Sequence, residues 1–108
     1  MTVKELSASC ALTPLALPAP EREVNGVYIG DLLSWVMGRA RENNAWITIM
    51  SNVNVIAVAT LADVSCVILA EGVMPEAEII SLAEQKGINL LRSDEAAFET
   101  AIKISGVQ

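Results

Sequence analysis

The fold is decided by residues 46–69, which read WITIMSNVNVIAVATLADVSCVIL. The two ends of this stretch, residues 46–50 and 64–69, are apolar runs rich in β-branched side chains, as is typical of buried strands. If the residues between them form a helix, the stretch is a strand-helix-strand unit. The two strands of such a unit are parallel and lie in one sheet, joined by a right-handed crossover.

Residues 51–63 allow two interpretations. Their valines and Ile56 favour a strand, and the alternative to a helix is then a hairpin that turns at residues 51–54. Four side chains instead recur at the spacing of one helix face: Val55, Val58, Ala59 and Ala62. Residues 51–54 also supply several side chains able to cap a helix. We therefore predict a helix here, because it completes the strand-helix-strand unit.

The alternation of strand and helix continues on both sides of this unit. An N-terminal helix at residues 3–9 and a short extended piece at 13–18 come first. The remaining predicted elements are strands at 24–29, 46–50, 65–69 and 88–91, and helices at 32–42, 51–63, 75–86 and from 93–95 onward. The strand at 24–29 starts irregularly, because Asn25-Gly26 disfavours regular pairing.

Several local signals support these helices. Asp31 is predicted to cap the helix at 32–42, and Pro75 suits the first turn of the helix at 75–86. Gly87 is predicted to end that helix in the C′ position.

The sequence also predicts which large side chains face inward. In the last helix, Phe98, Ala101 and Ile102 are expected to face the core. The two tryptophans, Trp35 and Trp46, are interpreted as core or interface anchors and not as stacking platforms for a ligand.

The predicted fold class is α/β. We expect a single three-layer-like domain with a mainly parallel sheet of about four to five strands that alternate with helices. The 108 residues suffice for one domain. We assign residues 1–23 to an N-terminal segment that packs on the domain and residues 24–108 to the α/β domain itself.

The composition excludes several classes of chemistry. The chain contains no histidine, which rules out Ser-His-Asp and Cys-His catalysis and the HExxH zinc site within it. Cys10 and Cys66 are the only cysteines, and they have neither CxxC spacing nor histidine partners. We predict two free thiols, no disulfide, no metal site and no cofactor.

The charge distribution indicates a surface unsuited to nucleic acid. Residues 1–54 carry four basic and five acidic side chains, and residues 55–108 carry three and eight, which gives a formal charge of −6. Arg39 and Arg41 are the nearest approach to a basic cluster. No stretch has the pattern of a signal peptide or of a membrane span. We expect a cytoplasmic protein that binds neither nucleic acid nor a membrane.

A ligand site is expected beyond the carboxyl ends of the strands, where strand-to-helix loops present helix N-termini. The candidate ligand-binding residues in these loops are Asp31, Ser34, Ser51, Asn52, Asn54, Glu71 and Gly72. Each residue alone is better explained by helix capping or a turn, so the prediction rests on their convergence. Asp31 and Glu71 are a conceivable acid-base pair, but no nucleophile signature, P-loop or GxGxxG sequence accompanies them, and we predict no catalytic residue.

Three runs of the sequence together resemble a DRTGG domain over roughly residues 24–104. They are VNGVYIGDLLSWVM at 24–37, NVIAVA at 54–59 and CVILAEG at 66–72. In this resemblance the Asp-Arg pair of the family falls near residues 51–52 and the Thr-Gly-Gly near 70–72, where only Gly72 is retained. DRTGG domains occur alone or beside CBS domains, and they are related to the N-terminal domain of bacterial HPr kinase/phosphorylase. The kinase chemistry of that enzyme belongs to a separate P-loop domain, which is not present in this sequence.

The resemblance implies a noncatalytic regulatory or ligand-sensing domain, which we expect to be a homodimer that binds a small molecule or a protein partner. The alternative is an interaction or assembly subunit of an anaerobic redox enzyme system, since similar bacterial proteins are sometimes encoded beside iron hydrogenase components. A serine kinase-like activity is the third hypothesis. The high hydrophobic content, 53%, favours assembly, because a small monomer has limited means of covering apolar surface.

Overall fold

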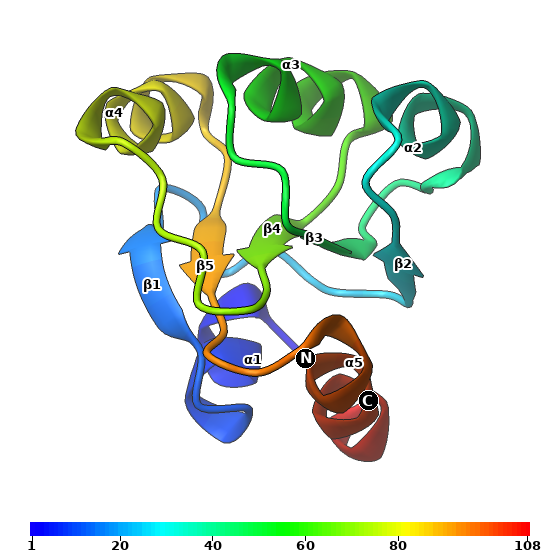
Figure 1. Ribbon diagram of the computed structural model, residues 1–108. Helices are drawn as coiled ribbons and strands as arrows, with labels where there is room; N and C mark the ends of the chain where they lie inside the picture. Colours follow the sequence, from blue (N-terminus) through cyan, green and yellow to red (C-terminus); the bar gives the residue numbers. More distant parts are fainter.

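The computed structural model describes residues 1–108, and a mixed five-stranded sheet forms its centre (Figure 1). The strands are β1 (Thr13–Ala16), β2 (Val27–Ile29), β3 (Ala45–Thr48), β4 (Cys66–Leu69) and β5 (Leu90–Arg92), in the spatial order β1-β5-β4-β3-β2. The helices are α1 (Val3–Ser9), α2 (Leu33–Arg39), α3 (Val53–Ala62), α4 (Ala77–Lys86) and α5 (Ala97–Val107). None of these helices has the length and apolarity needed to cross a membrane.

The predicted α/β class is confirmed. Strands β2, β3, β4 and β5 are parallel, and β1 pairs antiparallel with β5 along the opposite edge. The short extended piece predicted at residues 13–18 therefore supplies the fifth strand. Helices α2, α3 and α4 cover one face of the sheet, and α1 and α5 cover the other, which gives the three layers seen in Figure 1.

The helix interpretation of residues 51–63 is correct. Asn52 is the N-cap of α3, and its side-chain oxygen accepts a hydrogen bond of 2.9 Å from the backbone N–H of Asn54. Asp63 ends the helix in the left-handed conformation at φ 58°. The helix buries Val55, Ile56, Val58 and Ala59 against the sheet. The β-branched side chains thus serve packing, which outweighs their weak preference for strands.

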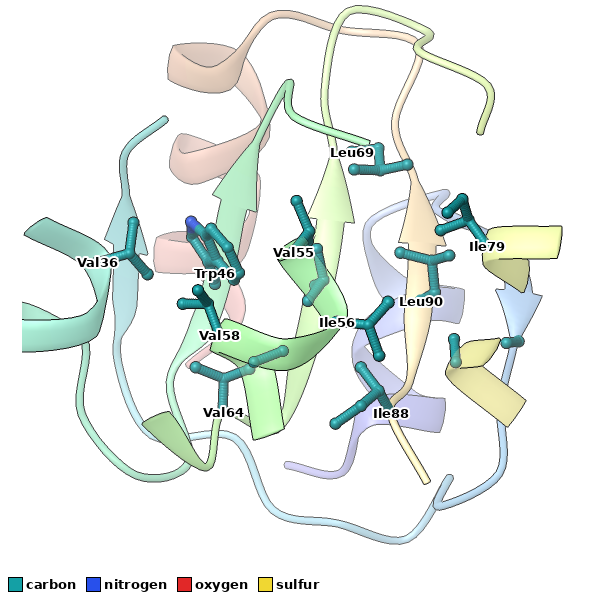
Figure 2. Close-up of a cluster of buried hydrophobic side chains, with 14 residues drawn as sticks. Val36, Trp46, Val55, Ile56, Val58, Val64, Leu69, Ile79, Ile88 and Leu90 are labelled. Carbon is teal, nitrogen blue, oxygen red and sulfur yellow. The ribbon is translucent and has the colours of Figure 1, made fainter. Parts of the chain in front are cut away.

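Two hydrophobic clusters lie on the two faces of the sheet. The cluster beneath α2, α3 and α4 includes Trp46, which is fully buried in β3 and lies beside Val36 and Val58 (Figure 2). The indole N–H of Trp46 donates to the backbone carbonyl of Gly30 at 2.9 Å, so this ring also anchors the end of β2. The second cluster contains Val3 and Leu6 of α1, together with Ile104 of α5. The N-terminal segment is therefore part of the core. The division at residue 23 stays a prediction.

The orientation predicted for α5 is wrong at two of three residues. Phe98 and Ile102 are 67% and 53% exposed, whereas Thr100 and Ile104 are buried and Ala101 is partly buried. The helix buries Thr100 and Ile104, and Ala97 and Ala101 pack against the same cluster. Phe98, the largest apolar residue of this helix, and Ile102 are therefore surface residues.

Trp35 is likewise not a core residue. Its side chain is 55% exposed, and the guanidinium of Arg39 lies 4.1 Å from the centre of its ring. One turn of helix separates the two residues, so the contact is a cation-π pair on the surface of α2. Of the two predicted anchors, only Trp46 lies in the core.

Two capping predictions are also corrected. The N-cap of α2 is Leu32, which makes no side-chain cap, because the carboxylate of Asp31 is bonded to β3 instead. Helix α4 begins at Ala77 with Glu76 as N-cap, so Pro75 precedes the first turn. Gly87 ends α4 at φ 73°, as predicted.

We predict that both thiols are unreactive in the folded protein. Cys10 and Cys66 are buried, and burial raises the pKa of the Cys66 thiol to about 12. At pH 8, a disulfide reagent should modify Cys66 of the Cys10→Ser variant only after denaturant unfolds the chain. Stoichiometric labelling of the native variant at the rate of a free thiol would contradict this burial.

Candidate functional site

Four parallel strands end at the same edge of the sheet. Every residue predicted for the site lies in a loop that follows one of these strands or in the first turn of the next helix. The β2–α2, β3–α3, β4–α4 and β5–α5 connections all leave this carboxyl edge. The structure does not gather the predicted residues in one cavity. It distributes them over one open cavity, one groove between helices and two structural loop contacts.

The open cavity lies between the start of α3 and the β4–α4 loop. It has a volume of about 410 Å³ and is lined by Ser51, Asn52, Val53, Met74, Glu76, Glu78 and Ile79. Ser51 and Asn52 are predicted site residues that the structure brings together here. The remaining residues were not predicted, because nothing in the sequence places the segment before α4 beside the start of α3. Their acidic side chains also have a simpler interpretation as partners of a helix N-terminus.

The chemistry of this cavity is acidic on one side and apolar on the other. A hydrogen bond with Glu76 and the negative charge of that neighbour raise the pKa of Glu78. The side chains of Val53 and Met74 are more than half exposed beside this pair. No Lys, Arg or His side chain lines the cavity. The arrangement therefore suits a ligand with an apolar body and a group that donates hydrogen bonds.

Ser34 and Asn54 share a different depression, the groove between α2 and α3. The groove has a volume of about 490 Å³ and is lined by Leu33, Ser34, Met37, Asn54, Ala57 and Val58. Most of this lining is apolar, so the groove is distinct in position and character from the acidic cavity. A ligand-binding role for Ser34 and Asn54 stays a prediction.

Asp31 serves as a connection between two loops. One of its carboxylate oxygens accepts hydrogen bonds from the Thr48 hydroxyl at 2.8 Å and from the backbone N–H of Ile49 at 2.9 Å. The Thr48 hydroxyl in turn accepts from the backbone N–H of Met50 at 3.1 Å. The β2–α2 loop is thereby fixed to the end of β3.

Glu71 and Gly72 fix the β4–α4 loop to the β5–α5 loop. Both residues have left-handed backbones, with φ values of 61° and 68°. Their N–H groups donate to the carbonyls of Glu95 and Ser93, each at 2.8 Å, and Arg92 Nε donates to the Gly72 carbonyl at 3.2 Å. β3 separates the strands that precede Asp31 and Glu71, a spacing of roughly 10 Å, and nothing in the site supports them as an acid-base pair.

We predict that Asp31→Ala destabilises the fold by about 1–2 kcal/mol, because it removes both acceptor bonds to β3. Asp94→Ala is the matched control. It removes only an exposed ion pair with Arg92 at 3.3 Å, which we expect to cost less than about 1 kcal/mol. Urea denaturation measures both changes. Equal stabilities of the two variants would show that the Asp31 contacts contribute little.

We predict opposite effects of substitutions at the two left-handed positions. Glu71→Gly should stabilise the chain by up to about 1 kcal/mol, because glycine adopts this conformation without a Cβ penalty. Gly72→Ala should destabilise it by about 1–2 kcal/mol through the backbone alone, since the added Cβ would lie at an ordinary 3.5 Å from Arg92 Nη2. Changes of the same sign in urea denaturation would contradict this explanation.

The fold is similar to a solved regulatory structure. The crystal structure of the CBS and DRTGG domains of the regulatory region of Clostridium perfringens pyrophosphatase, complexed with the activator diadenosine tetraphosphate, matches with a TM-score of 0.74 at 16% sequence identity. The match covers 95% of this chain and 45% of that chain. No curated protein matches the sequence.

These comparisons confirm the DRTGG resemblance and leave the kinship with HPr kinase/phosphorylase a prediction. The matching structure has the same arrangement of strands and helices, which is a likeness of fold. The DRTGG domain model itself matches residues 18–107, most of the chain. This protein therefore belongs to the DRTGG domain family.

Proposed function

We propose that this protein is a noncatalytic regulatory module that binds a small molecule in the cavity between α3 and the β4–α4 loop. The observation that carries the proposal is the cavity itself, an open space of about 410 Å³ at the carboxyl edge of the sheet. This is where ligands collect in open α/β sheets. Ser51 and Asn52, selected from the sequence for the same reason, lie in its wall.

The walls of the cavity favour a ligand of the nucleoside type. The exposed Val53 and Met74 side chains offer an apolar surface for a flat ring, and Glu76 and Glu78 offer acceptors for an exocyclic amine. Phosphate groups would have to point away from these carboxylates. The related regulatory region that binds a dinucleotide activator supports adenine nucleotides as the first ligands to test.

The proposed role is regulatory because the cavity holds no group suited to catalysis by itself. The chain has no histidine and no P-loop sequence, and the two glutamates of the cavity lie beside one serine that has no basic partner in the lining. The proposal therefore assigns no kinase chemistry to this chain. The buried free thiols suit a reducing compartment, and we place the protein in the cytoplasm.

The test compares Glu78→Lys with Glu99→Lys. Both glutamates lie in the first turn of a helix and both substitutions change the net charge by the same amount, but only Glu78 lines the cavity. Adenosine, ATP and diadenosine tetraphosphate are titrated by calorimetry against the wild type and both variants. We expect at least one compound to bind the wild type and Glu99→Lys alike, and to bind Glu78→Lys at least about tenfold more weakly, a loss of about 1.4 kcal/mol.

Two outcomes would overturn this proposal. The first is that none of the three compounds binds the wild type at millimolar concentration. The second is that a compound binds Glu78→Lys as tightly as it binds Glu99→Lys, which would place its site elsewhere.

A second candidate function, assembly, is favoured by a separate observation. Large apolar side chains are exposed on α2 and α5, among them Phe98, which the sequence predicts to face the core, and Trp35, which it predicts to be a core or interface anchor. An assembly role is compatible with ligand binding, because the two use different surfaces. In this role the module would join further subunits, for which the redox enzyme system implied by the family resemblance is the first context to test.

A further inference from the structure

The edge strand β2 presents unused backbone hydrogen-bonding groups to solvent. The Gly26 carbonyl accepts from the Ala45 N–H at 3.0 Å, and the Gly30 N–H donates to the Ile47 carbonyl at 3.1 Å. In a parallel ladder, the backbone groups of every second residue bond to the same neighbouring strand. The N–H and carbonyl of Tyr28 therefore point toward β3, whereas those of Val27 and Ile29 point away from it. Each copy of the chain thus has two N–H groups and two carbonyls directed outward along this edge.

The two edges of the sheet differ in their protection. The opposite edge strand, β1, contains Pro14 and an irregular register between Pro14 and Ala16, both of which discourage further strand pairing. β2 contains neither proline nor a charged side chain. β2 is only three residues long, but nothing else along it prevents its outward N–H and carbonyl groups from pairing with another strand.

Apolar side chains flank the β2 edge from both layers of helices. Figure 1 shows β2 at the rim of the sheet, with α2 on one side of it and α5 on the other. Leu33 and Met37 of α2 line the groove toward α3, so Trp35 lies on the opposite flank, above β2. On α5, Ala101 and Ser105 line a groove with Val27 and Ile29 of β2. Five large apolar residues of β2, the β2–α2 connection, α2 and α5 are at least half exposed: Ile29, Leu32, Trp35, Phe98 and Ile102.

We propose that β2 is the interface of a homodimer in which the β2 strands of two copies pair antiparallel about a twofold axis at Tyr28. Residue 27 of each copy then lies opposite residue 29 of the other. In each pair, Val27 of one copy and Ile29 of the other form two hydrogen bonds, N–H to carbonyl in both directions. The two pairs give four bonds, which use all eight outward N–H and carbonyl groups of the two strands. The two five-stranded sheets become one continuous sheet.

A second copy fits this edge better than another occupant because the surface is complementary to itself. A twofold axis places the same strand of both copies together, and the outward N–H and carbonyl groups of Val27 and Ile29 are complementary to themselves. It also sets α2 against α2 and α5 against α5, so the apolar flanks meet one another.

The exposed apolar area is of the size that a dimer needs. Five large side chains that are each at least half exposed present on the order of 500 Å² per copy, against roughly 800 Å² per partner in a standard interface that includes its polar rim. In the groove between β2 and α5, about 480 Å³ in volume, the Val27 and Ile29 side chains of both copies would pack together.

The first experiment measures mass by light scattering at about 100 μM, with Ile29→Lys and Val27→Pro as the disrupting variants. Leu61→Lys is the control, because Leu61 is also an exposed apolar residue but lies on α3. We expect twice the chain mass of 11.5 kDa for the wild type and the control, and the single chain mass for Ile29→Lys and Val27→Pro. If proline prevents folding, judged by circular dichroism, Ile29→Lys carries the test.

The second experiment tests the register. Mild oxidation of Tyr28→Cys should give a disulfide-linked dimer, because the axis pairs residue 28 with itself at about 4.5 Å between Cα atoms. Val27→Cys should not, because residue 27 meets residue 29 and lies beyond the roughly 7 Å reach of a disulfide from its own copy. The native thiols are buried and do not interfere.

A monomeric wild type, a dimer that persists in Ile29→Lys, or preferential cross-linking of Val27→Cys would each overturn the proposal. These outcomes do not depend on the ligand proposal, because none of the substituted residues lines the acidic cavity.

Discussion

The structure depends on the burial of β3 and β4 on both faces of the sheet. Every residue of these two strands is buried, including the polar Thr48. A parallel pair with apolar side chains on both faces requires a helical layer on each side. The crossover helices α2, α3 and α4 cover one face, and α1 and α5 are needed for the other. The N-terminal residues Val3 and Leu6 are consequently as deeply buried as the central strands.

This constraint explains how much of the fold the sequence predicts. The buried strands are continuous apolar runs between capping and turn residues, so their positions and their parallel pairing follow from local patterns. Residue propensities alone do not decide between a helix and a strand at residues 53–62. The need for a crossover between two buried parallel strands predicts the helix that is observed. The direction of β1 was not predictable, since a four-residue extended piece with a proline has no pattern that specifies its neighbour.

The wrong predictions of side-chain orientation all concern the outer surfaces of α2 and α5. Pattern analysis turns the largest apolar residues of a helix inward, but Trp35, Phe98 and Ile102 are more than half exposed, and α5 buries Thr100 and Ile104 instead. In the proposed dimer, a helix at the edge of the sheet packs against its own sheet and against the second copy. The apolar pattern of one sequence does not distinguish the residues of these two contacts. The errors in side-chain orientation therefore coincide with the proposed interface.

For the candidate site, the position of the loops is predictable from the sequence but the role of each residue is not. Asp31, Glu71 and Gly72 lie at the carboxyl edge of the sheet, as the sequence predicts. Asp31, however, fixes its loop to β3, and Glu71 and Gly72 fix the β4–α4 loop to the β5–α5 loop. The cavity depends on residues from separate segments, 51–53 and 74–79, whose proximity is a product of strand order. The bond from Ile49 to Asp31 joins the segment leading into this cavity to the segment that follows β2. The end of β2 is thus fixed to β3 both by the Asp31 carboxylate and by the Trp46 indole, which donates to the Gly30 carbonyl, so the strand at the edge and the segment that leads into the cavity share one rigid support.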